Sequence, residues 1–392
     1  MAHFEESQVQ RSLYTAEHAE FQALARSFFQ KECAPHTERW EQQGMVDREV
    51  WLKAGELGLL GWEAPVEYGG QGIRDYRYNA IMSEELIATG SAGVGFGLHN
   101  DIMPSYLIDL TNDEQKARWL PKWVSGESIS ALAMTEPGAG SDLKAIRTTA
   151  VPDGGDYILN GAKTYITNGY LADLVVVAAK TDPDAGHRGT SLFIVERGMP
   201  GFERGRKLDK IGRRSQDTSE MFFTDVRVPR ANLLGEENKG FYYLMRGLTR
   251  ERLACAVSAT ALMERALELT IDFVRGRQVF GAPLGAMQNT QFKLAEVKAA
   301  ALACRIQTDV MVGEFVAGRL TPEDAAATKF WVTERQWDAL DACLQLHGGA
   351  GYMNEYEIAR LWRDGRVQRI FAGSNEIMRH IVGRSLALDR QE

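Results

Sequence analysis

The sequence predicts an α+β protein in three consecutive parts: an N-terminal helical domain over residues 1–128, a central antiparallel β-barrel domain over 129–236 and a C-terminal four-helix bundle over 237–392. Helical periodicity marks the first and last parts, and short β-branched or aromatic runs between Gly, Pro and Asp clusters mark the middle part. A proline-free stretch from Gly240 to Arg275 is long enough for one helix of roughly 50 Å. Strands and helices do not alternate, and no G-x-G-x-x-G follows a predicted strand, so a doubly wound dinucleotide-binding fold is not expected.

The N-terminal part is predicted to be helical from about residue 16 to 127. Its first helix places apolar residues on one face at Phe21, Leu24, Ala25, Phe28 and Phe29. Pro35 ends this helix or lies just beyond it. Later helical segments are predicted at about 48–58, 75–89, 98–110 and 113–125, with Asp113 as a candidate N-cap of the last one.

The middle part begins near Ile129 and is predicted to consist of short strands. The run 156–159 leads into Asn160-Gly161, the strongest short hairpin signal, and the run 164–167 follows as the second strand. Further strands are predicted at 174–178, 191–195 and 220–224. Together these runs predict a compact antiparallel barrel or sandwich.

The C-terminal part returns to helical periodicity after Gly235. Two long segments follow the first helix, at about 288–317 and 322–347, and Thr321 is the predicted N-cap of the second, with Pro322 in its first turn. A last helix is predicted at about 376–388. Three long helices and a shorter one suggest a four-helix bundle.

The composition argues against several classes of function. The formal net charge of -8 and the absence of a basic block disfavour nucleic acid as a partner. The four cysteines form no C-x-x-C pair and no H-E-x-x-H occurs, so no metal site is indicated. No run of 18 apolar residues exists, and residues 1–10 are polar and acidic without an apolar signal core, so we expect a cytoplasmic protein that does not span a membrane.

The segment MTEPGAGSD at 134–142 is the first candidate ligand-binding motif. Gly138 and Gly140 permit close approach of a ligand to the backbone, and Thr135 and Ser141 offer hydroxyl groups. From these residues alone, an ordinary strand-to-loop turn is an equally good interpretation.

This nine-residue string resembles the signature of the acyl-CoA dehydrogenase family. The segment NGAKTYITNG at 160–169 resembles the second flavin segment of that family, RQVFG at 277–281 its Arg-x-x-Phe-Gly motif, and QLHGG at 345–349 its glycine-rich turn. The resemblance runs from about residue 130 to the C-terminus, and the helical N-terminal third is compatible with it. Segments 216–220, 234–243 and 373–378 look most like the long-chain acyl-CoA dehydrogenases.

The resemblance implies a bound FAD between the β domain and the C-terminal bundle. Residues expected near the flavin are Leu132, Met134, Thr135, Gly140, Ser141, Tyr165, Ile166 and Thr167. Thr167 would hydrogen-bond the reactive flavin edge, and Tyr165 would cover one face, where many relatives have Trp. Residues expected to reach the FAD of a neighbouring subunit are Arg277, Gln288, Gln345, Leu346, His347, Gly348 and Gly349; Phe280, Ser374, Asn375 and Glu376 are further candidate contacts.

The same resemblance implies partners: an acyl-CoA substrate, electron transfer flavoprotein as electron acceptor, and at least a homodimer, with a tetramer usual in the family. Residues implied at the substrate are Ser141, Tyr242, Thr249, Arg250, Arg252, Ala372 and Gly373. His347 is expected to be a packed turn residue that touches FAD rather than a proton carrier.

The family reaction needs a carboxylate base within reach of the substrate α-carbon. Ala372 stands where many relatives carry a catalytic glutamate, whereas Glu251 aligns with the base of the long-chain and isovaleryl-type enzymes. On spacing alone, Glu251 would be a solvated helix glutamate paired with a neighbouring arginine; the resemblance favours the base. Rival bases are Glu376, at the start of the last helix, and Glu136, beside Pro137.

The resemblance implies one role for the predicted base, Glu251, and another for the loop at Ala372, where many relatives carry the base instead. Burial should raise the pKa of Glu251 toward working pH. The backbone N–H of Ala372 would help to hold the thioester carbonyl oxygen, a role that does not need a side chain.

The resemblance therefore predicts an FAD-dependent dehydrogenase that converts a saturated acyl-CoA, medium or long in chain, into the trans-2-enoyl-CoA. One alternative keeps the fold and changes the chemistry: an oxidase or monooxygenase relative, or a dehydrogenase of acyl groups on a carrier protein. Another is a non-catalytic flavin-binding protein. Acyl chain length and branching are not readable from the sequence.

Overall fold

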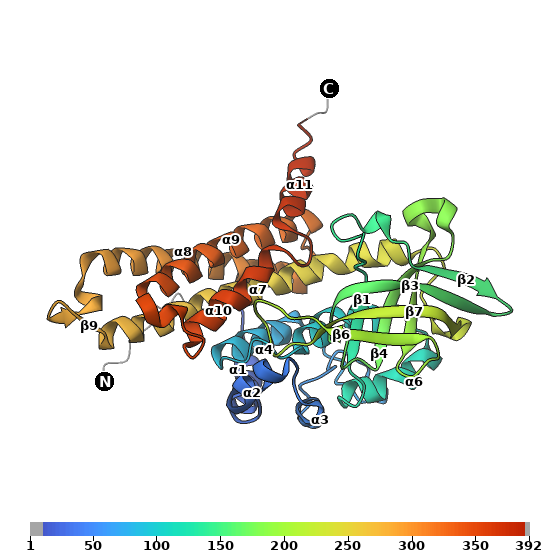
Figure 1. Cartoon of the computed structure of the whole chain (residues 1–392), viewed down its shortest axis with the longest axis horizontal. Coiled ribbons are helices and arrows are strands. Elements are labelled where there is room, and N and C mark those ends of the chain that lie inside the picture. Colours follow the sequence, from blue (N-terminus) through green and yellow to red (C-terminus); the bar gives the residue numbers. More distant parts are fainter. Residues whose placement is uncertain (1–10, 389–392) are drawn as a thin grey trace.

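The computed structural model describes residues 11–388, so residues 1–10, including the acidic segment considered above, lie outside the described part. The C-terminal helices form one end of the molecule and the β domain the other, the N-terminal helices lie along the lower side, and the long helix α7 (Gly240–Gly276) extends from the β domain through the C-terminal helices (Figure 1). Within residues 11–388, no helix combines the length and apolar composition needed to cross a membrane. The same residues contain no group of three or more His, Cys, Asp or Glu side chains suited to a metal ion.

The N-terminal part is helical, as predicted. Its helices are α1 (Ala16–Phe28), α2 (Thr37–Gln43), α3 (Arg48–Glu56), α4 (Tyr76–Ala88), α5 (Pro104–Leu107) and α6 (Asp113–Val124), with a short π-helical segment at Leu98–Ile102 before α5. The predicted N-cap of α6 is wrong by one residue. Asn112, not Asp113, caps the helix: its side chain accepts from the Gln115 N–H at 2.9 Å, and the Gln115 side chain accepts from the Asn112 N–H at 3.0 Å.

The middle part forms one eight-stranded sheet with the order β6-β7-β3-β2-β4-β5-β8, and β1 pairs with β4. The strands are β1 (Ser130–Ala133), β2 (Thr149–Asp153), β3 (Asp156–Thr167), β4 (Leu174–Lys180), β5 (Thr190–Glu196), β6 (Phe202–Lys207), β7 (Thr218–Pro229) and β8 (Leu233–Leu234). Most pairs are antiparallel, as predicted, but β1 and β2 each pair with β4 in parallel. Between β1 and β2 the chain passes through the segment 134–142, which carries the predicted flavin loop.

The hairpin predicted at Asn160-Gly161 is wrong. The chain turns earlier, at Gly154-Gly155, where φ is +67° and +139°, and β3 continues straight through residues 160 and 161. Gly161 lies at a register shift between β3 and β7, where a Cβ would come within 2.4 Å of the Thr148 side chain. Glycine is therefore needed here for close approach of two strands, not for a turn.

The C-terminal part contains three long helices, α7, α8 (Gln288–Val316) and α9 (Pro322–Leu346). The predicted cap of α9 is confirmed, because the Thr321 hydroxyl accepts from the Asp324 N–H at 3.1 Å. A short helix that the sequence analysis did not identify, α10 (Glu357–Gly365), packs against α9 and α7. The last helix, α11 (Asn375–Ser385), contacts α9 and then projects from the body of the molecule (Figure 1).

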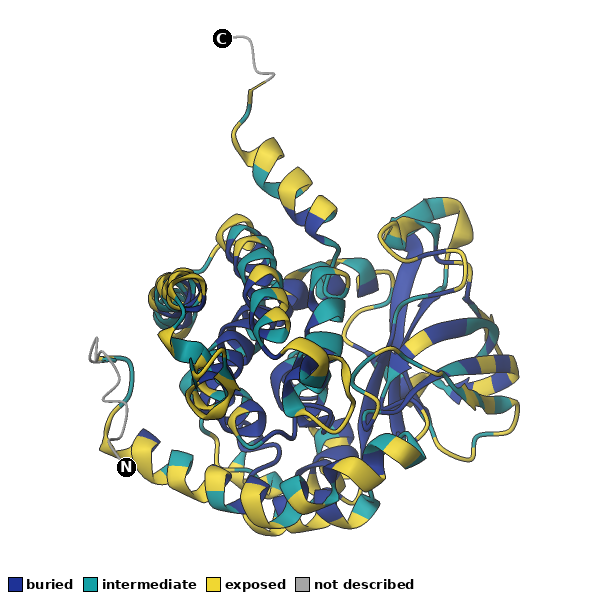
Figure 2. Ribbon diagram, turned by 60° about the vertical axis from the view of Figure 1, so that its left-hand side comes forward, coloured by how far each residue is buried: buried dark blue, intermediate teal, exposed yellow. Residues whose placement is uncertain are grey.

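The helices bury their facing sides and expose their outer sides (Figure 2).

A buried ionic cluster joins three of the helices to the segment before α1. Arg305 on α8 pairs with Glu84 on α4 at 2.5 Å and with Glu264 on α7, and Arg11 pairs with Glu84 at 2.8 Å. Although burial alone would raise the pKa of Glu84, these two arginines hold it below its ordinary value.

Replacing Arg305 by Met is expected to lower the free energy of unfolding by about 3 kcal/mol, because it leaves buried Glu84 short of a partner while keeping most of the side-chain volume. Urea denaturation at fixed protein concentration measures the change. Arg319→Met is the matched control, since Arg319 is exposed and pairs only with Glu314 on the surface. Equal losses in the two variants would contradict the importance of the buried cluster.

Candidate active site

Glu251 is a buried carboxyl group whose Oε1 lacks a hydrogen-bond partner among residues 11–388. It lies on α7 with 6% of its surface exposed. Burial raises its pKa to about 7, against the opposing attraction of Arg252. The interpretation as a solvated glutamate on a helix surface is therefore wrong, and the expected rise in pKa is present.

The two rival carboxylates have other roles. Glu136 forms a buried ion pair with Lys163 at 2.8 Å and accepts the N–H groups of Arg147 and Thr148 at 2.6 and 2.9 Å. Burial would raise the pKa of Glu136, but Lys163 and these hydrogen bonds lower it below its ordinary value. Glu376 is exposed in the first turn of α11, and hydrogen bonds from its own backbone N–H and from Ser374 lower its pKa. A carboxyl group with a lowered pKa is a weaker base than Glu251.

The loop before α11 is held in an unusual backbone conformation. Ala372 has φ +52° and Gly373 has φ +88°. A positive φ is uncommon for alanine and persists only where the surroundings enforce it. The backbone N–H of Ala372, predicted to hold the substrate carbonyl, therefore belongs to a fixed segment.

Buried polar groups on α9 enforce this conformation. The Lys329 ammonium, fully buried, donates to the Gly373 carbonyl at 2.8 Å and to the Asn375 side chain at 2.9 Å. The Asn375 side chain in turn donates to Thr333 and Glu334, each at 2.9 Å. Burial lowers the pKa of Lys329 to about 8, so the lysine remains largely protonated near neutral pH.

The segment just before this loop contacts α7. Gln368 donates to the Ser258 hydroxyl at 2.9 Å, and the Arg213 guanidinium lies 5.4 Å from the centre of the Phe371 ring. Ser258 is two helical turns beyond Glu251, so the loop and the buried carboxyl belong to one region. Sequence reasoning missed Lys329, Arg213 and Gln368, because single polar residues in helical or loop patterns carry no local signal.

The two predicted flavin segments lie side by side. The Thr164 N–H donates to the Thr135 carbonyl at 3.0 Å, and Lys163 donates to the Met134 carbonyl at 3.1 Å. Leu132 and Ile166 are buried in the core, whereas Gly140, Ser141 and Tyr165 are exposed and Thr167 is half-buried. Of the predicted contacts in these segments, Leu132 and Ile166 could therefore offer a ligand only their backbone.

Most of the other predicted cofactor residues lie at the opposite end of α7, beside β9 (Gln278–Val279) (Figure 1), whereas Ser374, Asn375 and Glu376 belong to the loop before α11 and to its first turn. Those exposed there are Arg277, Phe280, Gln288, Gln345, Gly348 and Gly349; Leu346 is half-buried. His347 is buried, stacks on Phe273 with ring centres 4.2 Å apart and bonds the Cys343 carbonyl at 2.8 Å, as expected for a packed turn residue. One chain does not bring the two groups together, since 37 helical residues, roughly 55 Å, separate them.

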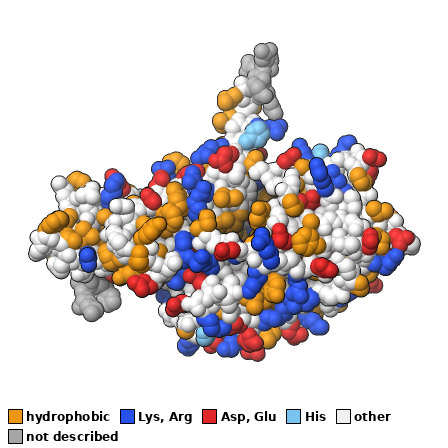
Figure 3. All heavy atoms as spheres, viewed as in Figure 1, with side chains coloured by type: hydrophobic (Ala, Val, Ile, Leu, Met, Phe, Trp, Pro, Cys, Tyr) orange, Lys and Arg blue, Asp and Glu red, His pale blue; other side chains and the backbone are white. Residues whose placement is uncertain are grey.

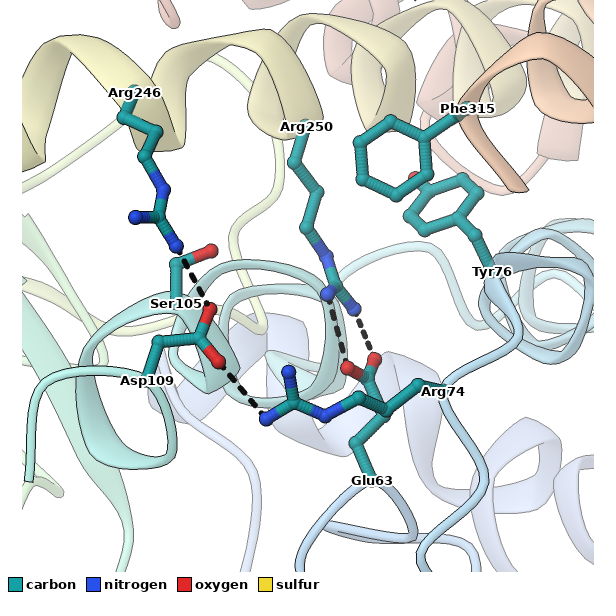
Figure 4. A pocket seen from close by; sticks show the side chains of 8 residues that line it. All are labelled: Glu63, Arg74, Tyr76, Ser105, Asp109, Arg246, Arg250 and Phe315. Carbon is teal, nitrogen blue, oxygen red and sulfur yellow. Dashed lines mark hydrogen bonds and ion pairs between the residues drawn. The ribbon is translucent and has the colours of Figure 1, made fainter. Parts of the chain in front are cut away.

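The predicted substrate residues are also dispersed. Tyr242 is exposed, Thr249 is half-buried, and Arg252 is buried with an unpaired Nε. Arg250 points away from Glu251, because neighbouring helical residues diverge by about 100°. It pairs with Glu63 in a separate polar pocket of about 290 Å³, where Arg74 and Arg246 flank Asp109 (Figure 4).

Three family models match the chain in consecutive order: the acyl-CoA dehydrogenase N-terminal domain at residues 15–127, the middle domain at 131–226 and the C-terminal domain at 238–387. Together they span almost all of the sequence.

Relatives and solved structures agree with these matches. The chain is 46% identical to the mitochondrial long-chain specific acyl-CoA dehydrogenase of Sus scrofa, over 97% of this chain and 89% of that protein, and 39% identical to the isovaleryl-CoA dehydrogenase of Pongo abelii, over 95% and 89%. It superposes on an acyl-CoA dehydrogenase from Geobacillus kaustophilus with a TM-score of 0.95 at 48% identity, covering 97% of this chain and 100% of the other. An acyl-CoA dehydrogenase from Bacillus anthracis complexed with FAD gives a TM-score of 0.89 at 33% identity, over 95% and 67%. The chain therefore belongs to the acyl-CoA dehydrogenase family.

Proposed function

We propose that this protein is an FAD-dependent acyl-CoA dehydrogenase in which Glu251 is the catalytic base. The observation that carries the proposal is the state of Glu251: buried, without a hydrogen-bond partner on Oε1, and with a pKa of about 7. A carboxyl group in that state is poised to accept a proton near neutral pH, and it is costly to bury without such a use.

In the proposed reaction, Glu251 removes the proton from the carbon next to the thioester carbonyl. The backbone N–H of Ala372 donates to the carbonyl oxygen and stabilises the negative charge that develops there. Lys329 keeps the Ala372–Gly373 backbone in place, and the packing around Glu251 excludes water from the base. When bound, FAD supplies the acceptor for the hydride that leaves the β-carbon.

The described residues fit an FAD site. A side chain at Gly138 or Gly140 would meet no atom within 4 Å, so the main chain there is open to a ligand, and the Ser141 and Tyr165 side chains are exposed beside it. Gly348 and Gly349 are equally open at the far end of the bundle. Residues Leu132 to Ser141 and Tyr165 to Thr167 would contact the flavin of their own chain, and the group near Arg277 that of a neighbour.

We propose a homotetramer as the working assembly. Figure 3 shows scattered hydrophobic areas on the surface of the bundle half. The exposed large apolar side chains of the bundle include Phe280, Phe292, Val310, Trp331 and Tyr352. Contact with other copies would cover them and bring the two groups of cofactor residues together. Electron transfer flavoprotein is the proposed electron acceptor, as is typical of the family. A cytoplasmic location stays a prediction, since the relatives compared are named as mitochondrial.

The proposed substrates are medium- or long-chain saturated acyl-CoA esters, on the strength of the likeness to the long-chain specific enzymes. Retention of a buried base argues against the alternatives that lose the base, whereas an oxidase relative would keep the base and differ in passing its electrons to oxygen. Carrier-protein thioesters would use the same base and loop and differ only in the group attached beyond the thioester.

Anaerobic mixing of the FAD-loaded protein with a panel of acyl-CoA esters, from short and branched to long, tests the function. We expect the visible absorbance of the flavin to bleach with medium- and long-chain esters. If no CoA ester bleached a fully loaded protein, the CoA proposal would be wrong, and carrier-protein thioesters would be the next substrates to examine.

The variant Glu251→Gln is expected to reduce the rate of flavin reduction at least a hundredfold, because the amide cannot accept the α-proton. Stopped-flow absorbance measures the rate. Glu268→Gln is the matched control, since Glu268 is an exposed glutamate on the same helix. An unchanged rate in Glu251→Gln, or a comparable loss in Glu376→Gln, would overturn the assignment of the base.

Because Glu251 must be ionised to act, the second-order rate constant for flavin reduction should rise with pH and level off above its pKa of about 7. Below that pKa the rate should fall about tenfold for each pH unit. The profile is measured by stopped flow from pH 5.5 to 9, at substrate concentrations far below saturation. A profile that is flat over this range would show that the titrating base is not Glu251.

A further inference from the structure

Two buried oxygen atoms without hydrogen-bond partners border the same small space beside α7. One is the hydroxyl of Tyr106 on α5, which is fully buried, and the other is Oε1 of Glu251. Gly247 lies between them, one helical turn before Glu251. A Cβ at position 247 would be 2.8 Å from the tyrosine hydroxyl and 3.8 Å from Oε1.

The chemical character of the two groups is complementary. Burial, together with the nearby Glu251, raises the pKa of Tyr106 well above its ordinary value, so the hydroxyl keeps its proton at any working pH. An ionised carboxylate only accepts hydrogen bonds, and a phenol can donate one. Buried polar atoms that find no partner are rare in folded proteins and destabilise them.

We propose that Tyr106 is a positioning residue for the base: its hydroxyl donates a hydrogen bond to the ionised carboxylate of Glu251 across the space left open at Gly247. This inference rests on the proposed function, because it assumes that Glu251 is the base. The two oxygens are not hydrogen-bonded in the structure, so the contact requires the glutamate side chain to rotate toward the tyrosine, and it would hold the carboxylate in one orientation until substrate arrives.

Other charged or titratable groups lie in the same region, and within residues 11–388 none of them donates a hydrogen bond to Oε1 of Glu251. On α7 itself, Arg252 attracts the ionised form and Cys255 lies one turn further on. From α9, Lys329 acts on Arg252 and Cys255, but its hydrogen bonds go to Gly373 and Asn375. Arg213, on the loop before β7, acts on Cys255 and is bonded to Asp364 and Ser258. Tyr106 is the group from α5.

The inferred hydrogen bond has a defined consequence for pH dependence. A donor to the charged form of a carboxyl group stabilises that form and lowers the pKa. Removing the Tyr106 hydroxyl should therefore raise the pKa of Glu251 by about one unit, which is the size typical of a hydrogen bond to a charged group. At pH values well below both pKa values, the ionised fraction should then fall about tenfold.

The test compares Tyr106→Phe with the unaltered holoenzyme. The rate of flavin reduction should fall about tenfold at pH 5.5 and stay unchanged at pH 9, where Glu251 is ionised in both proteins. The pKa of Glu251 is read independently of turnover from the infrared band of its protonated carboxyl group, identified by its loss in Glu251→Gln. That band should titrate about one unit higher in Tyr106→Phe. Gly247→Ala, which puts a methyl group against the hydroxyl, should shift it in the same direction.

Tyr157→Phe is the matched control, because Tyr157 is a buried tyrosine of the β domain whose hydroxyl interacts with Glu237, ahead of α7, and not with Glu251. It should leave both measurements unchanged. If the infrared titration and the pH profile of Tyr106→Phe coincide with those of the unaltered enzyme, while Glu251→Gln still loses flavin reduction, Tyr106 has no such role and the base assignment stands. If Glu251→Gln itself keeps the normal rate, the base assignment is wrong and this inference falls with it.

Discussion

The proposed active site depends on one constraint. The carboxyl group of Glu251 must be kept away from water and from any close partner. Glu251 is nearly fully buried on α7, and the first turn beyond it is also buried. A pKa raised from 4.5 to about 7 means that the folded protein binds a proton more tightly than the unfolded chain. Stability is therefore lost as pH rises through that window, by an amount on the order of 3 kcal/mol. The ion pairs around Glu84 and Glu136 lie elsewhere in the fold, where strong pairing does not disturb the base.

Two buried lysines stabilise the two loops of the proposed site by donating hydrogen bonds to main-chain carbonyls. Lys163 on β3 donates to the Met134 carbonyl and pairs with Glu136, and Lys329 on α9 donates to the Gly373 carbonyl and to Asn375. Burial lowers the pKa of each to about 8. In both cases a buried lysine ammonium, which is costly to bury, donates a hydrogen bond to a main-chain carbonyl and thereby fixes a segment that is predicted to contact the ligand. Such fixed main-chain segments need no reorganisation when charge develops in a reaction.

The elements that were predictable from the sequence are those whose signal is local and repeated. Helix α7 was predicted at 240–275 and ends at Gly276, and the Thr321 cap depends only on residues within one turn. The hairpin prediction at Asn160-Gly161 was wrong because the turn preference of this dipeptide is weaker than the pairing of β3 with β2 and β7. Helix α10 was not predicted because it is too short to show a clear helical period. Glu251 was identified through family resemblance, whereas its burial arises from helices distant in sequence. The roles of Lys329 and Tyr106 were not predictable from the sequence, because they depend on contacts with residues distant in the chain. The domain limits at 128 and 236 stay predictions.

The length of α7 sets a geometric condition on any flavin site in this protein. Its first turns lie at the β domain, with the proposed flavin loop, and its last turn leads into the strand pair that carries Arg277 and Phe280. No side chain spans a separation of roughly 55 Å, so the two groups of predicted cofactor residues can meet only if a second copy runs in the opposite direction. Such a pairing places the exposed end of each bundle against the β domain of its partner. In the proposed tetramer, the open glycines at 348 and 349 and the fully exposed Phe280 would become parts of a flavin site that one chain does not complete. Assembly of the copies would then be a condition for cofactor binding, because the two groups of residues lie at opposite ends of one helix.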